Sequence, residues 1–402
     1  MHRTFIITVG TGQKEEDLRN LAKGFGTFLN DFYPEKTIFV GSKDSEKTVK
    51  LIKEEVQKLK GQPLQYAKFH LLKDIDDVQM IFEEISQIIE ENNDSQIFIN
   101  FTSGTKSMSL AAGLCSVAYK TTLLSLSGER NENGVVDNQK STYKRNNLYR
   151  VYDKFNIEKM KKYFNIYRFE EAKEILGDIA DINAKESYQL LFQYYDKWDK
   201  FNHKMKLEDI NCEDFDDEYF KEQFKKNQEA IKELKRIQDD ENDYYILADL
   251  INNSQRRYDE RKYDDAVARL YRCIELIAQI KLNKKYNIDT ADIKVNQLKD
   301  KVPKEYYKKL ANNKGKLFFP LKRAYGLLDK LGDSIAKSFN ENDELNDILN
   351  DRNQSILAHG KKTISKEKYY KMKENTINLA KELNENIEEY MDECEFPKFN
   401  ID

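Results

Sequence analysis

The sequence predicts an α/β domain with a parallel sheet at its N-terminal end, followed by an all-α half. In residues 1–153, short apolar runs typical of buried strands alternate with amphipathic helical stretches. Strands separated by helices form βαβ units, and such units build parallel sheets. After about residue 155 the strand patterns stop, and almost all of the chain to Glu395 is compatible with helix.

Five buried strands are predicted, at Phe5–Val9, Thr37–Val40, Lys68–Leu72, Ile97–Phe101 and Thr122–Leu126. Amphipathic helices are expected between them, for example over Glu15–Asp31 and Asp74–Glu91. The polar stretch Glu129–Asn147 contains Asn-Glu-Asn-Gly and predicts a hairpin or an excursion from the sheet. A last strand is then expected at Leu148–Tyr152.

The helical half is divided near residue 245. The predicted domains are residues 1–153, a helical linker over residues 154–245, and a helical bundle over residues 246–402. We expect the bundle to end with a helix that carries Arg352, followed by one long helix over Lys366–Tyr390.

Composition restricts the classes of function. The 402 residues carry a net charge of −4, so any nucleic acid must bind at local basic sites. No apolar run approaches the roughly 18 residues of a membrane span, and the first residues lack a signal-peptide layout, which predicts a cytoplasmic protein with no membrane partner. The four cysteines and four histidines lie far apart in the sequence, so we expect no metal site.

Two loops rich in small residues follow predicted strands, at Thr8–Gln13 and at Asn100–Met108. Ligands of parallel sheets bind at the carboxyl ends of strands, and glycines there let a ligand approach the backbone. In the second loop, Thr-Ser-Gly-Thr-Lys precedes a predicted helix, so hydroxyls, helix N–H groups and Lys106 favour an anion site. The first loop is equally compatible with an ordinary turn. Neither loop has the spacing of an ATPase P-loop.

Arg352, Asn353 and His359 lie in the run Asp-Arg-Asn-Gln-Ser-Ile-Leu-Ala-His-Gly. A separation of seven residues is two helical turns, so we expect Arg352 and His359 to share one helix face. An imidazole that moves protons and a guanidinium that holds phosphate can together cleave a phosphodiester without metal. The alternative is a surface arginine and a helix-terminal histidine above a capping Gly360.

An arginine cluster lies close to this segment in the predicted bundle. The chain has 14 Arg against 53 Lys, yet five arginines fall within 17 positions: Arg256, Arg257, Arg261, Arg269 and Arg272. Arg269 and Arg272 are three residues apart and are candidates for contacts with RNA phosphates. Salt bridges with Asp265 and Glu275 on a solvated helix face are an equally good interpretation.

These segments resemble two known families. The run Asn-Phe-Thr-Ser-Gly-Thr-Lys-Ser-Met at residues 100–108 resembles the signature of CARF domains, the Rossmann-like sensors of type III CRISPR defence. Arg352-Asn353 with His359 resembles the Arg-x(4–6)-His motif of HEPN ribonucleases, and Tyr263–Gln279 is similar to the first helix of one HEPN family. Ser103 stands where CARF domains usually have Gly.

The resemblance implies a homodimeric, metal-independent endoribonuclease that cyclic oligoadenylate activates and that cuts single-stranded RNA to 2′,3′-cyclic phosphates. His359 would be the general acid/base, Arg352 would stabilise the phosphorane, and Asn353 would position phosphate or imidazole. The ligand site would comprise Gly10, Thr11, Gly12, Gln13, Ser42, Thr102, Ser103, Gly104, Thr105 and Lys106. The tetra-adenylate ring is favoured over the hexa-adenylate ring, no other cofactor is expected, and the CARF domain could also cleave its activator.

A second class of function stays open from the sequence. The N-terminal domain would sense a nucleotide, while the helical half would be a non-catalytic adaptor that binds a partner. In that case Arg352 and His359 would be structural. RNA cleavage that is lost when His359 is replaced would separate the two classes.

Overall fold

The computed structural model describes residues 2–11, 14–128, 142–180, 182–204, 206–236, 242–290, 293, 295–299, 301–306, 317, 319–355 and 360–401. The chain divides into two compact units. The first comprises residues 1–156 with 179–181, and the second comprises residues 157–178 with 182–402.

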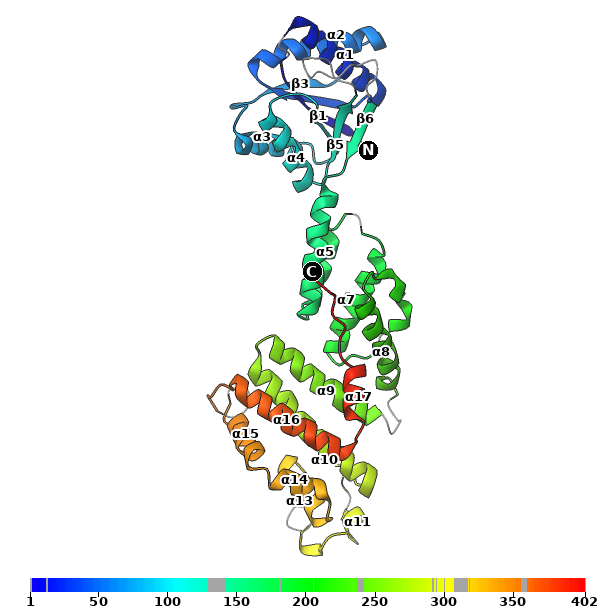
Figure 1. Cartoon of the computed structure of the whole chain (residues 1–402), viewed down its shortest axis with the longest axis vertical. Coiled ribbons are helices and arrows are strands. Elements are labelled where there is room, and N and C mark those ends of the chain that lie inside the picture. Colours follow the sequence, from blue (N-terminus) through cyan, green and yellow to red (C-terminus); the bar gives the residue numbers. More distant parts are fainter. Residues whose placement is uncertain are drawn as a thin grey trace. The chain divides into compact units, whose positions relative to one another are not determined.

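A six-stranded sheet forms the centre of the first unit (Figure 1). Its strands are β1 (Arg3–Val9), β2 (Lys36–Gly41), β3 (Ala67–Leu71), β4 (Gln96–Asn100), β5 (Thr122–Ser127) and β6 (Thr142–Asn146). Their order is β3-β2-β1-β4-β5-β6, and all neighbours are parallel except β5 and β6. The predicted Rossmann-like parallel sheet is therefore confirmed. The chain order reverses between β1 and β4, where such sheets place their ligands.

Helices cover both faces of this sheet, and the alternation along β1 shows why. Phe5, Ile7 and Val9 pack in one core with helices α1 (Glu15–Phe32) and α2 (Glu46–Lys60). Ile6 belongs to the opposite core, with helices α3 (Val78–Glu90) and α4 (Lys106–Ala118). A short 3-10 helix, η1 (Lys43–Ser45), precedes α2. Both faces are buried, as expected for strands with continuous apolar runs.

One predicted strand of this unit is wrong. The segment Leu148–Tyr152 is not a strand, because helix α5 (Tyr149–Asn165) begins within it. The last strand is β6, which lies inside the polar stretch that was expected to be a hairpin or excursion, and it pairs antiparallel with β5. The apolar pattern misled because Val151 and Tyr152 are 62% and 50% exposed on a helix, so their periodicity does not report burial in a sheet.

The second unit begins with linker helices around an aromatic core. They are α5, α6 (Phe169–Asp178), α7 (Lys185–Asp199), η3 (Leu207–Asp209), η4 (Cys212–Asp214) and α8 (Glu218–Leu234). Trp198, the single tryptophan, is fully buried and stacks on Tyr195. A distant segment completes this core, because Phe399 stacks on Phe220 with ring centroids 4.1 Å apart. Asn165 also exchanges two hydrogen bonds with the Phe399 backbone.

A helical bundle forms the rest of the second unit. Its helices are α9 (Asn242–Asp259), α10 (Tyr263–Tyr286), α11 (Val295–Leu298), α13 (Leu321–Lys330), α14 (Ser334–Asn340), α15 (Asp343–Asn353), α16 (Lys366–Leu383) and α17 (Ile387–Glu393). The single long helix expected over Lys366–Tyr390 is wrong. The chain leaves the helix at Asn384, where the side chain accepts a hydrogen bond from the Asn386 N–H, and α17 starts afresh.

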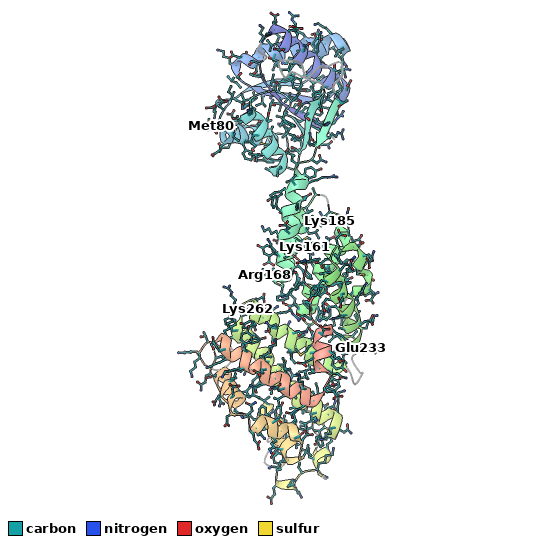
Figure 2. All side chains as sticks on the ribbon, viewed as in Figure 1. Met80, Lys161, Arg168, Lys185, Glu233 and Lys262 are labelled. Atoms are coloured by element: carbon teal, nitrogen blue, oxygen red, sulfur yellow. The ribbon has the colours of Figure 1, made fainter. Side chains whose placement is uncertain are left out.

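The surface of the second unit is strongly charged, and Arg168, Lys185 and Lys262 are among its exposed residues (Figure 2). Within the described ranges, no helix has the length and apolar character needed to cross a membrane.

Candidate functional site

The loops that follow β1 and β4 lie in direct contact at the point where the strand order reverses. β1 and β4 are parallel neighbours, with Ile7 opposite Asn100. The Thr8 hydroxyl donates a hydrogen bond to the Ser103 carbonyl, and the Gly10 N–H donates to Ser103 Oγ over 3.1 Å. Ser103, the departure from the usual Gly, therefore joins the two loops through its hydroxyl.

Two glycines make this close approach of the loops possible. A Cβ at Gly10 would lie 2.8 Å from the backbone nitrogen of Gly104, nearer than real Cβ atoms come. Gly104 itself has φ +115°, a backbone conformation that side chains disfavour. Gly10 and Gly104, two of the three glycines in the predicted ligand set, are thus required by the geometry of the loops.

The threonines of the second loop hold its shape. Thr102 Oγ1 donates to Asn100 Oδ1 over 2.6 Å and accepts from the Leu126 N–H over 2.9 Å. Thr105 Oγ1 donates to the Ile75 carbonyl and, as the N-cap of α4, accepts from the Met108 N–H. Both hydroxyls are therefore engaged in the loop itself.

Lys106, Thr11 and Ser42 complete the described part of the predicted ligand set. Lys106 is exposed as the first residue of α4, and Thr11 is exposed as well. The hydroxyl of Ser42, which follows β2, pairs with that of Ser45. Gly12 and Gln13 lie outside the described residues.

Sequence reasoning missed two residues that shape this edge of the sheet. Ser45 donates from its hydroxyl to the Val9 carbonyl over 2.8 Å, which ties the turn after β2 to the end of β1. Asn100 is fully buried; its Oδ1 orders Thr102, while its Nδ2 has no hydrogen-bond partner among the described residues. An asparagine that ends an apolar strand was the available signal for the second of these.

Arg352 lies in the last turn of α15 and stacks on an aromatic ring from α10. Its Cζ is 4.1 Å from the centroid of the Tyr271 ring, and Nη1 donates to Asn353 Oδ1 over 3.3 Å. Asn353 therefore holds one edge of the Arg352 guanidinium. The helix α15 ends at Asn353, and His359, which was expected to share a helix face with Arg352, lies outside the described residues.

The chain on both sides of residues 356–359 is held at the end of α15. The Gly360 N–H donates to the Ser355 carbonyl over 3.0 Å, and the Lys362 N–H donates to the Gln354 carbonyl over 3.1 Å. A Cβ at Gly360 would lie 1.8 Å from the Gln354 oxygen. Gly360 is thus needed for the close approach of two backbones and is not the cap of the Arg352 helix.

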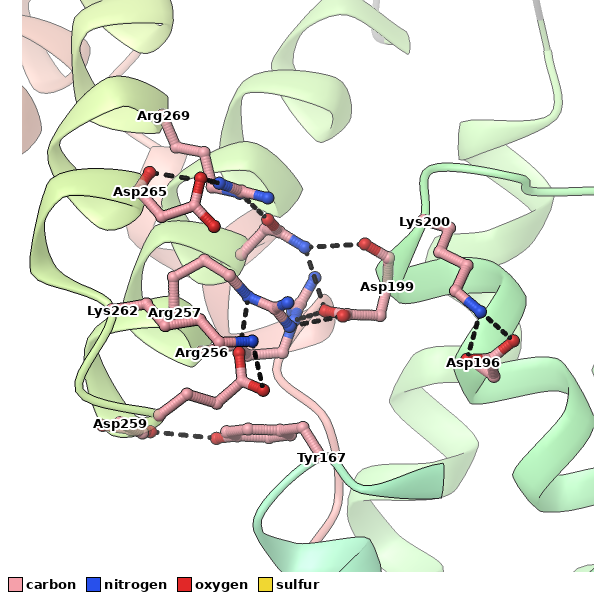
Figure 3. A network of polar contacts seen from close by, with 12 residues as sticks. Tyr167, Asp196, Asp199, Lys200, Arg256, Arg257, Asp259, Lys262, Asp265 and Arg269 are labelled. Atoms are coloured by element: carbon pink, nitrogen blue, oxygen red, sulfur yellow. Dashed lines mark hydrogen bonds and ion pairs between the residues drawn. The ribbon is translucent and has the colours of Figure 1, made fainter. Parts of the chain in front are cut away.

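The arginine cluster divides into buried and exposed members. Arg256 is 3% exposed; it donates from Nε to Asp199 over 2.8 Å and from Nη2 to Asp249 over 3.2 Å (Figure 3). Arg257 pairs with Asp199 and, over 3.0 Å, with Glu260. These two arginines join α9 to the end of α7, so they are structural and not phosphate ligands.

Arg269 and Arg272, the candidate phosphate contacts, both have partners within the bundle. Arg269 donates from Nη1 to Asp265 over 2.9 Å and from Nε to Asn253 Oδ1, whose own amide group donates to Asp199 (Figure 3). Arg272 lies 3.7 Å from Glu275 with half of its side chain exposed. Both salt bridges of the alternative interpretation are therefore present, although the Arg272 side chain stays half exposed.

The titratable groups around Arg352 support a neutral phenol in its neighbourhood. Burial is the main cause that raises the pKa of Tyr271, Glu275 raises it further, and Arg352 opposes the change.

In the part of the chain that the structure describes, no three His, Cys, Asp or Glu side chains are grouped so as to hold a metal ion.

Comparison with known proteins finds family models that match three successive segments of the chain. Family models match for the Card1 CARF domain at residues 26–145, the Csm6 6H domain at residues 152–239 and the Csm6 HEPN domain at residues 220–383. Enterococcus italicus Csm6 bound to cyclic hexa-2′-fluoro-hexa-dAMP has the same fold, with a TM-score of 0.66 and 14% identity over 98% of this chain and 99% of that chain. No curated protein matches the sequence. The chain therefore belongs to the CARF–HEPN proteins of the Csm6 type.

Proposed function

We propose that this protein is a cyclic oligoadenylate-activated, metal-independent endoribonuclease that cuts single-stranded RNA in type III CRISPR antiviral defence. The observation that carries the proposal is the set of contacts that Arg352 makes in the HEPN bundle: an aromatic ring and a neutral amide. No carboxylate among the described residues forms an ion pair with it, so its guanidinium keeps an open edge for a phosphate. The touching loops of the CARF sheet supply the sensor site.

The proposed chemistry is attack of a ribose 2′-OH on its own 3′-phosphate, which leaves a 2′,3′-cyclic phosphate. His359 moves the proton as general acid/base, and Arg352 stabilises the negative charge that develops on the phosphorane. Asn353 accepts a hydrogen bond from Arg352 in the structure, so it can orient the guanidinium as well as the phosphate.

A homodimer belongs to the proposal because each chain supplies one acid/base group, whereas the reaction uses one acid and one base. Exposed apolar side chains on the CARF unit support a partner surface: Leu110 and Leu114 on α4, and Val151, Tyr152 and Phe155 on α5. Light scattering at micromolar concentration should give twice the chain mass of 47.6 kDa. A fully active monomer would contradict this part of the proposal.

Cyclic oligoadenylate is the proposed activator, with Lys106 and the N–H groups at the start of α4 as phosphate contacts. The tetra-adenylate remains the favoured ring. Both even-numbered rings suit a two-fold dimer, however, and the ligand of the Enterococcus italicus protein is a hexa-nucleotide analogue. Titration with both rings decides between them, and chromatography of the same reactions shows whether the ring itself is cut.

The decisive experiment is cleavage of a fluorescent single-stranded RNA with and without each ring. Arg352→Ala and His359→Ala should abolish activated cleavage, whereas His2→Ala, at an exposed histidine of the CARF unit, should keep it. General acid–base catalysis contributes roughly 10²–10⁴-fold, so loss of His359 should leave little activity.

Two further results bear on the mechanism and on the competing function. EDTA should not reduce the rate, because Arg352 and His359 do the chemistry that a metal would otherwise do; inhibition by EDTA would refute the metal-independent mechanism. A wild type that binds a ring but never cuts RNA would instead favour the adaptor.

A further inference from the structure

The side chain of Arg352 has different contact partners from those of three other arginines in the bundle. Arg256, Arg257 and Arg269 all face carboxylates at hydrogen-bonding distance. Arg352 has a ring beneath it, with its Cζ 4.1 Å from the Tyr271 centroid, and a neutral amide beside it. Arg256 also lies over a ring, with its Cζ 3.9 Å from the Phe396 centroid, so Arg352 is distinguished by having a ring beneath it and no carboxylate partner among the described residues.

Asp351 and Glu275, which adjoin the two members of this stack in their helices, are engaged with other cations. Asp351, the neighbour of Arg352, pairs with Lys368 over 2.5 Å and with Lys362 over 3.9 Å. Glu275 lies one helical turn after Tyr271 on α10 and pairs with Arg272 over 3.7 Å. These two carboxylates are thus paired with lysines and Arg272, and neither forms an ion pair with Arg352.

This arrangement suits a group that must bind phosphate. A guanidinium has two flat faces and an edge of N–H donors, and it recognises phosphate through the edge. A carboxylate would compete for the edge and neutralise the charge, whereas an aromatic ring attracts the cation through its face and leaves the edge available. A tyrosine phenol is neutral near pH 7, and burial raises the pKa of Tyr271 further.

We propose that Tyr271 is a positioning residue of the nuclease, which fixes the Arg352 guanidinium by stacking so that its N–H edge is presented to the RNA phosphate. The inference rests on the proposed ribonuclease function. Tyr271 comes from α10 and Arg352 from the end of α15, so the stack also ties the catalytic segment to the central helix of the bundle.

The ring, and not the hydroxyl, does the positioning. The Tyr271 hydroxyl has no hydrogen-bond partner among the described residues, whereas the ring packs against the bundle core and under Arg352. Tyr271→Phe should therefore cut activated RNA at nearly the wild-type rate. Tyr271→Leu keeps an apolar side chain but removes the aromatic face, so it should cut activated RNA more slowly than the wild type.

The test compares kcat/KM for single-stranded RNA at saturating activator. Tyr271→Leu should lower kcat/KM by about 5- to 30-fold, which equals about 1–2 kcal/mol at 1.36 kcal/mol per factor of ten. Tyr263→Leu is the matched control: it removes another partly buried tyrosine of α10, eight residues before Tyr271 and so about 12 Å away along the helix, and it should change kcat/KM less than twofold. Tyr271→Met replaces the leucine variant if that protein unfolds.

A coupling measurement separates positioning from a merely structural role. In an Arg352→Lys background, which keeps the charge but lacks the planar guanidinium that stacks on the ring, Tyr271→Leu should lower the remaining cleavage by a much smaller factor than it does in the wild type. Activator affinity should stay unchanged in every variant. Equal rates for Tyr271→Leu and wild type, or a phenylalanine variant as slow as the leucine variant, would overturn the inference. A wild type without RNA cleavage would instead overturn the proposed function.

Discussion

Replacement of Asp199 by alanine should destabilise the second unit far more than replacement of its neighbour Asp196. Asp199 accepts hydrogen bonds from Arg256, Arg257 and Asn253, and only 11% of its side chain is exposed. Removal of this carboxylate leaves Arg256, 3% exposed, with Asp249 as its only partner among the described carboxylates. A buried charge that loses its partner is costly because it can neither hydrate nor dissociate its proton.

The expected magnitude follows from burial. Removal of one partner of a buried ion pair costs about 3–5 kcal/mol, whereas an exposed pair contributes about 0–1 kcal/mol. Asp196 provides the exposed case on the same helix: it pairs with Lys200 over 2.7 Å, and 62% of the lysine side chain is exposed. With a urea m-value of about 3 kcal/mol/M, Asp199→Ala should lower the midpoint by roughly 1–1.7 M.

Tryptophan fluorescence during urea unfolding measures this directly. The single tryptophan, Trp198, precedes Asp199 and is fully buried, so its emission reports on the core beside the network. Asp196→Ala should move the midpoint by less than about 0.3 M, given the small value of an exposed pair. Equal midpoints for the two variants would refute the argument that the buried arginines depend on Asp199.

Three further outcomes are expected. Lys106→Ala should weaken activator binding by about 1.5–3 kcal/mol in calorimetry, the range for a hydrogen bond to a charged group, while basal RNA cleavage at high enzyme concentration survives; equal affinities would place the ligand elsewhere. Gly10→Ala should lower the thermal stability of the CARF unit by about 1–3 kcal/mol because its Cβ has no room, whereas Gly177→Ala, in open space on α6, should not destabilise the protein. Asp333 should contribute stability that is complete above about pH 5 and lost in more acidic solution. Burial alone would raise its pKa, but hydrogen bonds from Lys285, Tyr286 and a backbone N–H hold that pKa below its ordinary value, and acid titration of Asp333→Asn should show a shallower loss.

The sheet could be predicted because its information is local. Runs such as Phe5–Val9 and Ile97–Phe101 lie between amphipathic helices, and parallel order follows from that alternation. Leu148–Tyr152 could not be assigned correctly, since apolar residues exposed on a helix resemble a strand in the pattern. The break at Asn384 depends on a side-chain turn of three residues, which periodicity over a long window averages out.

The two candidate sites show the same division between local and distant information. The loop at Thr102–Lys106 and the Arg352-Asn353 pair were visible as motifs. The partners that define them were not: Ser103 meets Gly10 from 93 positions away, and Arg352 meets Tyr271 from another helix. The structural role of Arg256 within the arginine cluster could not be predicted either, because Asp199, its partner, lies 57 residues earlier in the sequence.

The stacking of Phe399 on Phe220 also has a consequence for synthesis of the chain. A ribosome that adds 5–20 residues per second needs roughly 10–35 s to pass from residue 220 to residue 399. During that time the aromatic core of the linker lacks the two rings that complete it, since Phe396 also packs there against Trp198. The linker is made before the HEPN bundle, yet its core can close only after the bundle has been synthesised. Growing chains should therefore be most open to proteases and chaperones between α6 and α8, and a chain that stops after α17 should keep this vulnerability after its release.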